Sequence, residues 1–297
     1  MRRRWPATGR VSSYDVDMTK KRSNFINAAD ISDAVYLGKA YTIVASMWES
    51  GPRGGYVRYS SEHIPTSFFC DPQSTLSGVP GSEAGRNPLP DTADVEEALH
   101  RWGVREGRPV VVYDQGPGLF AGRAWWVLRW AGLPDVRILN GGLAEWDRLE
   151  YPIIGGPGNI AFGGDQEATF GSMPTASIDD VRNFDGILVD TRQPNRFAGR
   201  REGLDLKAGH IPGAVNVPME DLVDKRRVVL SPEAIRERFA RVGVTSAEDV
   251  IVYSGSGLHS SYVIAAMEYA GMGVPAHFVE GWSLWAADPA NPVERGD

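Results

Sequence analysis

Apolar residues in this chain form two kinds of segment, which alternate along its length. Short runs rich in Val and Ile are typical of strands buried on both faces, and segments with apolar residues every three to four positions are typical of helices. The runs are YTIVASM, VVVYD, VRILN, GILVDT, VIVYS and AHFVE, and the helical segments include DVEEALHRWG, PEAIRERFARVG and SSYVIAAMEYAG. This alternation predicts an α/β fold of mostly parallel sheets with helices on both faces.

Three segments occur twice, in the same order. The pairs are SEHIPTSF with AGHIPGAV, PVVVYDQGPGLFAGRAWWVLRWAG with DVIVYSGSGLHSSYVIAAMEYAG, and LNGGLAEW with VEGWSLW. Tyr113 and Tyr253 are separated by the same number of residues as Gly141 and Gly281. A constant separation indicates a duplicated domain, so we predict two tandem copies of one fold.

A Gly- and Pro-rich stretch, YPIIGGPGNIAFGGDQ, separates the two copies and predicts a surface linker. The arginine-rich start is not followed by an apolar run long enough for a secretory signal or a membrane span. Translation from Met18 is an alternative that the sequence leaves open. We therefore expect a disordered tail at residues 1–22, a first domain at 23–151, a linker at 152–172 and a second domain at 173–297.

Composition and charge narrow the classes of function. The 31 basic and 38 acidic residues are mixed along the chain and give a net charge of −7, so we expect no basic face for nucleic acid or an anionic membrane. Cys70 is the one cysteine, which excludes an internal disulfide, and no Cys/His spacing resembles a zinc site. We expect a cytoplasmic protein with no metal and no cofactor.

The loop that follows the run VIVY is the first candidate for a binding site, because ligands bind beyond the carboxyl ends of parallel strands. Gly255 and Gly257 permit positive φ and a tight curve that turns backbone N–H groups inward. The helix that begins near His259 adds the positive end of its dipole. Together these features favour an anion, although any strand-to-helix turn also uses glycines.

Four segments resemble the rhodanese superfamily, in particular its tandem-domain thiosulfate and 3-mercaptopyruvate sulfurtransferases. They are the duplicated HIPGA-like segment, the VDTR strand, the VYSGSGL loop and the closing GWSLW, and the resemblance covers nearly all of the chain after about residue 25. In that family the second-domain loop begins with cysteine, commonly as CGSG, an aliphatic residue and Thr or Ser. Here the loop is Ser254-Gly255-Ser256-Gly257-Leu258-His259. The loop therefore matches the family, and the nucleophile does not.

The resemblance implies sulfur transfer through a cysteine persulfide. The thiolate takes sulfane sulfur from thiosulfate or 3-mercaptopyruvate and passes it to a thiol or to cyanide. A serine hydroxyl titrates far too high and forms no equivalent persulfide, so we expect Ser254 to leave this sulfurtransferase-like chain inactive in that step. The alternative function is a non-catalytic module that binds an anion or a persulfidated partner for regulation.

Three explanations for Ser254 stay open. They are a cysteine-to-serine change in an active enzyme, a naturally degenerate member of the family, and a different chemistry. A different chemistry would be hydrolysis with His259 as base, although the G-x-S-x-G elbow is missing, or a thiol relocated to Cys70. The structural alternative for Cys70 is a buried core residue.

The same resemblance assigns further site residues. Asp71 aligns with an aspartate beside the cysteine of mercaptopyruvate-specific relatives, and Ser256 aligns with a loop serine of the same proton-handling set. Arg192 resembles the family arginine that engages the sulfonate or carboxylate of the donor, and its alternative is a salt bridge to Asp190. The expected catalytic positions are Ser254, Ser256 and Asp71, and the expected substrate-binding positions are Arg192, Arg196, Gly255, Gly257, Leu258 and His259.

The first half of the chain lacks the acid and the arginine expected beside the second loop. Its matching loop begins with Asp114, which would repel an anion, and its matching strand has Ala45 and Met47 in place of an acid and an arginine. We therefore expect the first domain to be structural. Three tryptophans at helical spacing are expected in the core and the domain interface; they are Trp125, Trp126 and Trp130. For Trp282 and Trp285, a place in the pocket wall and a place in the core are both possible.

Overall fold

A computed structural model describes residues 23–37, 41–161 and 163–296. The tail expected at residues 1–22, and with it the question of a start at Met18, lies outside these residues.

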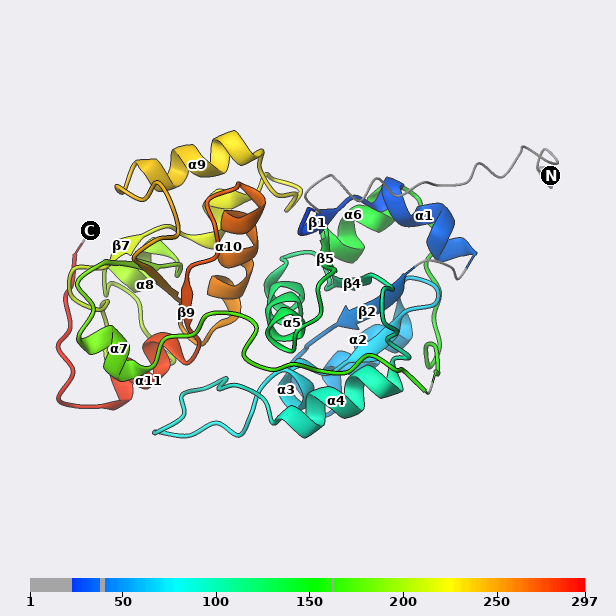
Figure 1. The fold of residues 1–297 in the computed structure, drawn as a ribbon, viewed down its shortest axis with the longest axis horizontal. Coiled ribbons are helices and arrows are strands. Elements are labelled where there is room, and N and C mark those ends of the chain that lie inside the picture. The colour runs from blue at the N-terminus through cyan, green and yellow to red at the C-terminus, as the bar shows by residue number, and fades with distance from the viewer. Residues whose placement is uncertain (1–22, 38–40, 162, 297) are drawn as a thin grey trace.

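The first sheet has five parallel strands. They lie in the order β1-β5-β4-β2-β3, with β1 at Phe25–Ile26, β2 at Thr42–Ser46, β3 at Phe68–Cys70, β4 at Val110–Tyr113 and β5 at Val136–Leu139. The helices of this half are α1 (Ala28–Tyr36), α2 (Gly54–Ser61), α3 (Pro72–Thr75), α4 (Thr92–Arg101), α5 (Leu119–Trp130) and α6 (Gly142–Arg148). The fold class predicted from the apolar pattern is confirmed in this half (Figure 1).

The second sheet repeats four of these strands. Its order is β7-β6-β8-β9, all parallel, with β6 at Ile187–Asp190, β7 at Val215–Asn216, β8 at Val250–Tyr253 and β9 at Ala276–Phe278. The helices are α7 (Ile178–Arg182), α8 (Pro194–Phe197), the 3-10 helix η1 (Met219–Leu222), α9 (Pro232–Ala240), α10 (Leu258–Tyr269) and α11 (Gly281–Ala287). Strands β3-β2-β4-β5 of the first half correspond to β7-β6-β8-β9, so the predicted duplication is confirmed.

The repeated histidine and tyrosine make the same contacts in both halves. His63 and His210 are buried, and in each the Nδ1 atom lies 2.8 Å from a backbone carbonyl of the preceding helix. Tyr113 and Tyr253 end their strands. Each tyrosine hydroxyl accepts a hydrogen bond from the backbone N–H of the isoleucine that follows the histidine, at 3.0 Å from Ile64 and at 3.2 Å from Ile211. These repeated residues therefore hold the fold and are not free for chemistry.

Helices α5 and α10 pack against each other where the two halves meet (Figure 1). A Cβ at Gly122 would lie 2.8 Å from the Cβ of Tyr262, so the close crossing of these helices requires glycine. One hydrophobic core runs through both halves at this contact and includes Trp125, Trp126 and Trp130, as predicted. An apolar interface of this kind fixes one domain against the other.

The chain between α3 and α4 leaves the first half and runs toward α11 (Figure 1). The backbone N–H of Arg86 in this segment donates to the hydroxyl of Ser283 in α11 at 3.0 Å. Beside that contact Trp282 and Trp285 are 0% and 3% exposed, in the core of the second domain. A residue of the first half is thus brought to the carboxyl end of the second sheet.

Neither a membrane-spanning helix nor a metal-binding cluster is found among the described residues. None of their helices is both long enough and apolar enough to cross a membrane. Within the same residues, no cluster of three or more His, Cys, Asp or Glu side chains is placed to hold a metal ion.

Candidate functional site

The loop between β8 and α10 has the conformation of an anion cradle. Gly257 precedes the helix with φ of 80°, the left-handed region that glycine adopts without strain. The expectation of positive φ also at Gly255 is wrong, because Gly257 is the loop glycine with that conformation. Gly255 instead lies close to an arginine, since a Cβ there would lie 2.9 Å from Nη2 of Arg86 and would displace the end of that side chain.

Ser254 is fully buried at the start of this loop, and its hydroxyl belongs to a chain of hydrogen bonds. Its Oγ accepts from the backbone N–H of Gly257 at 3.0 Å and lies 3.0 Å from Oγ of Ser260. Ser260 Oγ in turn lies 2.7 Å from Nε2 of His277, which is also fully buried. Three polar side chains, from the first residue after β8, from α10 and from β9, therefore meet beneath the loop.

Several backbone N–H groups of the loop have no acceptor among the residues that the structure describes. The carbonyls of Ser254 and Gly255 are held by α11, whose N–H groups donate to them at 2.8 and 2.9 Å. In the described part of the chain no residue accepts a hydrogen bond from the N–H groups of four loop residues, which are Gly255, Ser256, Leu258 and His259. These donors and the positive end of α10 are available to a negative ligand.

Three guanidinium groups lie around Gly255. The position that its Cβ would occupy is 2.9 Å from Nη2 of Arg86, 3.5 Å from Nη1 of Arg196 and 3.9 Å from Cδ of Arg192. Burial, then the positive charge of Arg196, lowers the pKa of Arg86. The two halves of the molecule thus bring cations together at one loop residue, as a site for an anion requires.

Arg192 is the most deeply placed of the three. Its Nη2 atom lies 2.6 Å from Oδ2 of Asp190, the two side chains are 1% and 0% exposed, and its guanidinium lies 4.6 Å from the ring centre of Trp282. The salt bridge stated above as the alternative for Arg192 is therefore present. Its Nη1 atom keeps no hydrogen-bond partner among the described residues and lies 3.9 Å from Glu202.

Two carboxylates hold the other arginines. Arg196 Nη2 lies 2.8 Å from Glu202 and 2.9 Å from Asp205, and Arg86 also pairs with Asp205. Burial opposes ionisation of Glu202, but the N–H of Leu204 and the Arg196 side chain outweigh it and lower the pKa of this carboxyl. An incoming anion must therefore compete with these carboxylates.

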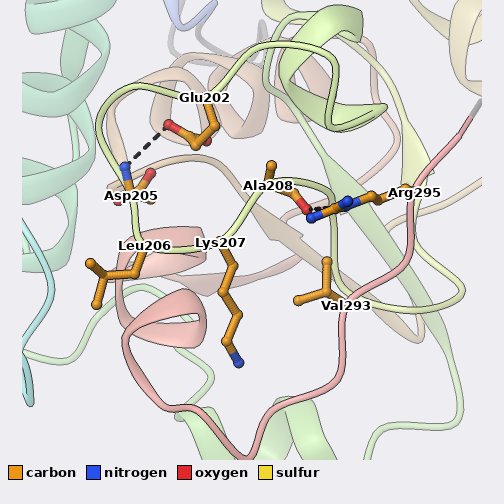
Figure 2. Close-up of a pocket in the computed structure, with 7 residues that line it drawn as sticks. All are labelled: Glu202, Asp205, Leu206, Lys207, Ala208, Val293 and Arg295. Atoms are coloured by element: carbon orange, nitrogen blue, oxygen red, sulfur yellow. Dashed lines mark hydrogen bonds between the residues drawn. The ribbon is translucent and has the colours of Figure 1, made fainter.

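Figure 2 shows the segment that carries Glu202 and Asp205. The backbone N–H of Asp205 donates to Glu202 at 3.2 Å, and Arg295 donates to the carbonyl of Ala208 at 3.0 Å. Glu202 and Asp205 also line an open cavity of about 540 Å³, together with Lys207 and Arg295. Leu204 and Leu206 beside it are 69% and 84% exposed, so little apolar burial holds this segment in place.

Two residues that contact the loop were not identified from the sequence. Asn87 Nδ2 donates to Ser256 Oγ at 2.7 Å, and Arg86 comes from the same segment of the first half. Neither residue is part of the duplicated pattern.

The structure does not bring Asp71 to the loop. Its carboxylate caps α3 by accepting from the N–H of Gln73 at 3.0 Å, and it lines a separate cavity with Trp48 and Arg53. In residues 23–37, 41–161 and 163–296, no hydrogen bond or ion pair joins Asp71 to the loop. Neighbouring Cys70 is 1% exposed, and burial, then the charge of Asp71, raises its pKa. The relocated thiol would thus be inaccessible and protonated.

His259 is the second residue of α10 and is partly buried. Burial is the largest cause that lowers its pKa. No hydrogen bond of the described residues joins its ring to Ser254, so the geometry of a serine with His259 as its base is not present. The histidine linked to Ser254 is His277, which the sequence did not single out because it lies within an apolar strand.

The matching loop of the first half is occupied by its own side chain. Asp114 is fully buried, and its carboxylate accepts four backbone hydrogen bonds of 2.9 to 3.2 Å, from the N–H groups of Gly116, Gly118, Phe120 and Ala121. These four donors are thus taken by the protein's own carboxylate and are not left for an external anion. The expectation that this loop is structural fits this geometry.

Comparison with known proteins gives concordant matches. Residues 53–149 and 176–288 match the model of the Rhodanese-like domain. The chain is 36% identical over 253 residues to a Pseudomonas aeruginosa protein named "Probable 3-mercaptopyruvate sulfurtransferase", covering 83% of this chain and 89% of that one. It is 34% identical over 246 residues to the 3-mercaptopyruvate sulfurtransferase of Escherichia coli K12, covering 80% and 84%. The crystal structure of SseA from Escherichia coli, described as a rhodanese fold of 3-mercaptopyruvate sulfotransferases, matches with a TM-score of 0.75 and 28% identity over 88% of this chain and 100% of that one.

Proposed function

The chain belongs to the rhodanese family, and from this premise we propose that it binds a small sulfur-containing anion at the loop after β8 without appreciable persulfide transfer. By homology it is a sulfurtransferase of the thiosulfate and 3-mercaptopyruvate type. Ser254 takes the place of the nucleophilic cysteine in this proposal. The ligand class is thiosulfate, 3-mercaptopyruvate or a related anion.

One observation carries the proposal: N–H groups that have no acceptor among the described residues, together with arginines, surround a residue that is uncharged. The loop offers the N–H groups of Gly255, Ser256, Leu258 and His259, and Arg86 and Arg196 lie against Gly255. A family enzyme would place a thiolate here. Because a serine hydroxyl is neutral, the positive potential of the loop is left for a ligand.

Sulfur transfer itself needs a sulfur nucleophile. In the family reaction the thiolate forms a bond to the sulfane sulfur of the donor, the donor's own bond to that sulfur breaks, and a thiol or cyanide later removes it. The Ser254 hydroxyl stays protonated at neutral pH and cannot hold sulfane sulfur as a persulfide does. The described thiol, Cys70, is buried in the first half and cannot substitute.

Other residues keep roles that suit binding. Arg196 and Arg86 would exchange their carboxylate partners for the anion. Arg192, which is held by Asp190, would add positive charge beneath the loop without leaving its partner. Asn87 fixes the Ser256 hydroxyl at the rim of the loop. The binding function needs no cofactor.

The direct test is to assay sulfur transfer from thiosulfate and from 3-mercaptopyruvate to cyanide and to a thiol, with the natural chain and with Ser254→Cys. We expect no turnover above background for the serine chain. Ser254→Cys supplies the missing thiolate in a cradle that stabilises it, so it should gain at least about a hundredfold over that background. Ser254→Ala is the matched control and should stay at background.

Binding is tested separately by titrating sulfate and thiosulfate calorimetrically. A saturable heat with the natural chain supports the proposal, and its reduction in Arg196→Gln locates the site. Robust sulfur transfer by the serine chain would overturn the inactive assignment. The absence of saturable binding would overturn the ligand-binding assignment and leave a loop that only holds the fold.

A further inference from the structure

The hydrogen-bonded chain of Ser254, Ser260 and His277 has no counterpart in the first half of the molecule. Gly118 and Gly257 both precede a helix with φ of 80°, which aligns Ala121 with Ser260. Val112 pairs with Ile138, and Val252 pairs with His277, which aligns Ile138 with His277. The duplicated fold therefore accepts alanine and isoleucine at these positions, and the polar pair occurs in the half that has the neutral hydroxyl.

His277 is neutral in this environment. It is 0% exposed and lies edge-on to the ring of Trp126, with centres 4.7 Å apart. Burial, then the positive charge of Arg123, holds its pKa well below the ordinary value. A neutral imidazole carries one N–H, so one ring nitrogen donates and the other can only accept.

The unpartnered ring nitrogen decides which tautomer is favoured. Nδ1 has no hydrogen-bond partner among the described residues, whereas Nε2 lies 2.7 Å from Ser260 Oγ. A proton on Nδ1 would leave a buried donor without an acceptor, which is rarer and costlier than an unused lone pair. The proton is therefore placed on Nε2, and His277 donates to Ser260.

The direction of the remaining bonds follows from that donor. Ser260 accepts from His277, so its own hydroxyl proton is free to be donated to Ser254 at 3.0 Å. Ser254 Oγ then accepts twice, from Ser260 and from the N–H of Gly257. Both lone pairs of the Ser254 oxygen are used, and among the described residues its proton has no acceptor.

We propose that His277 and Ser260 are positioning residues that turn the Ser254 hydroxyl into a hydrogen-bond donor for the anion bound in the loop. The inference rests on the proposed binding function and names how the substituted residue serves it. Each hydroxyl in the series is polarised by the donor behind it, which strengthens the last bond to the ligand. The ligand favoured by this arrangement is an oxyanion that only accepts, such as sulfate or thiosulfate.

The test compares sulfate and thiosulfate affinity, by calorimetry, in variants that carry the residues of the first half. Ser254→Ala removes the donor and should weaken binding about tenfold, the size of one hydrogen bond to a charged group. Ser260→Ala and His277→Ile remove the residues behind it and should weaken binding about three- to tenfold. Ser260→Thr and His277→Gln keep a hydroxyl and an N–H at these places and should retain affinity within about twofold of the natural chain.

A double-mutant cycle separates positioning from a structural role. If Ser260 acts through Ser254, then adding Ser260→Ala to Ser254→Ala should change affinity by less than about twofold. An equal loss in both backgrounds would overturn the proposal, because it would mean that Ser260 affects the loop by another route. Unchanged affinity in Ser260→Ala and His277→Ile would also overturn it. Where His277→Ile fails to fold, Ser260→Ala and the cycle decide alone.

A chemical probe tests the direction of the hydrogen bonds from His277 through Ser260 to Ser254. A donor hydroxyl at 254 is not deprotonated by His277, so a fluorophosphonate should not label Ser254. Labelling of that serine would show proton flow toward His277 and would overturn the assigned direction. If the natural chain binds neither sulfate nor thiosulfate, the proposed function fails first; if it binds them and the variants are unaffected, this inference fails alone.

Discussion

The loop after β4 and the loop after β8 begin their helices with the same left-handed glycine, and they hold different groups. In the first loop the carboxylate of Asp114 accepts four backbone N–H groups, and in the second the hydroxyl of Ser254 accepts one. One cradle is therefore filled by a charge of the protein itself. In the other loop, N–H groups have no acceptor among the described residues. This difference is the best indication of which half binds a ligand.

The strands beside the two loops differ in the same sense. Ala45 pairs with Tyr113 in the first sheet and Asp190 pairs with Tyr253 in the second, so Ala45 corresponds to Asp190 and Met47 to Arg192. The first half is apolar where the second has a buried ion pair. The charged residues at the second loop are thus not demanded by the fold.

The largest expected effect on stability comes from replacing one member of that ion pair with the apolar residue found at the matching position of the first half. Arg192→Met leaves the Asp190 carboxylate buried at 0% exposure without its cation, and should lower the free energy of unfolding by about 3–5 kcal/mol. Urea unfolding followed by circular dichroism measures the change.

The double variant Asp190→Ala/Arg192→Met is the matched control. It removes both charges and restores the pair found in the first half, so it should be markedly more stable than Arg192→Met alone. Equal instability of both variants would mean that Arg192 holds the fold through Trp282 and Gly209 rather than through Asp190.

The next effect compares the two loop residues directly. Asp114→Ala leaves four buried N–H groups without their acceptor and should cost about 3 kcal/mol, whereas Ser254→Ala removes one such acceptor and should cost about 1 kcal/mol. Thermal and urea unfolding of the two variants give the difference. Similar losses would indicate that water replaces the Asp114 carboxylate, and the contrast between a filled and an open cradle would weaken.

Much of the fold could be predicted from sequence because its signals are local. Apolar runs such as VVVYD and VIVYS predicted the central strands, and the constant spacing of Tyr113 and Tyr253 predicted the duplication. Tertiary contacts could not be read in that way. The crossing of α5 and α10 at Gly122 depends on one absent side chain, which has no distinct pattern among the many glycines of the chain.

The candidate site was predicted in part. The loop, Arg192 and Arg196 were named from short segments of sequence, and Nη1 of Arg196 lies 3.5 Å from the position of a Cβ on Gly255. Arg86, Asn87 and His277 come from distant segments, and contacts over such separations leave no periodic signal. Among the described residues no hydrogen bond joins Asp71 to the loop, and its carboxylate instead caps α3, a local bond that alignment does not reveal.

A pH effect of intermediate size tests the difference between His277 and its counterpart Ile138. The pKa of His277 is held below its unfolded value, so below about pH 6.5 the unfolded chain takes up a proton that the folded chain does not. Stability should therefore fall as the pH falls from 6.5, with a contribution of about 1.4 kcal/mol per pH unit from this residue.

His277→Gln isolates that contribution. The slope of unfolding free energy against pH between 5.5 and 6.5 should be smaller in the variant than in the natural chain, because other histidines are unchanged. Equal slopes would indicate that His277 is protonated in the folded protein, and the tautomer assigned to it would then be wrong.

The smallest expected effect concerns the thiol, which lies in the half whose loop is filled. Cys70 is 1% exposed and its pKa is raised by burial and then by Asp71, so Ellman's reagent should not react with the folded chain on the timescale that labels the urea-unfolded chain. Position 254 is also buried, so exposure does not separate the two thiols; the N–H of Gly257 and the start of α10 favour a thiolate there, and in Ser254→Cys the introduced thiol should react faster than Cys70. Rapid labelling of Cys70 in the natural chain would instead show an accessible thiolate in the first half. The reactive centre would then have moved to the domain assigned a structural role, and the contrast between the two loops would no longer indicate where chemistry occurs.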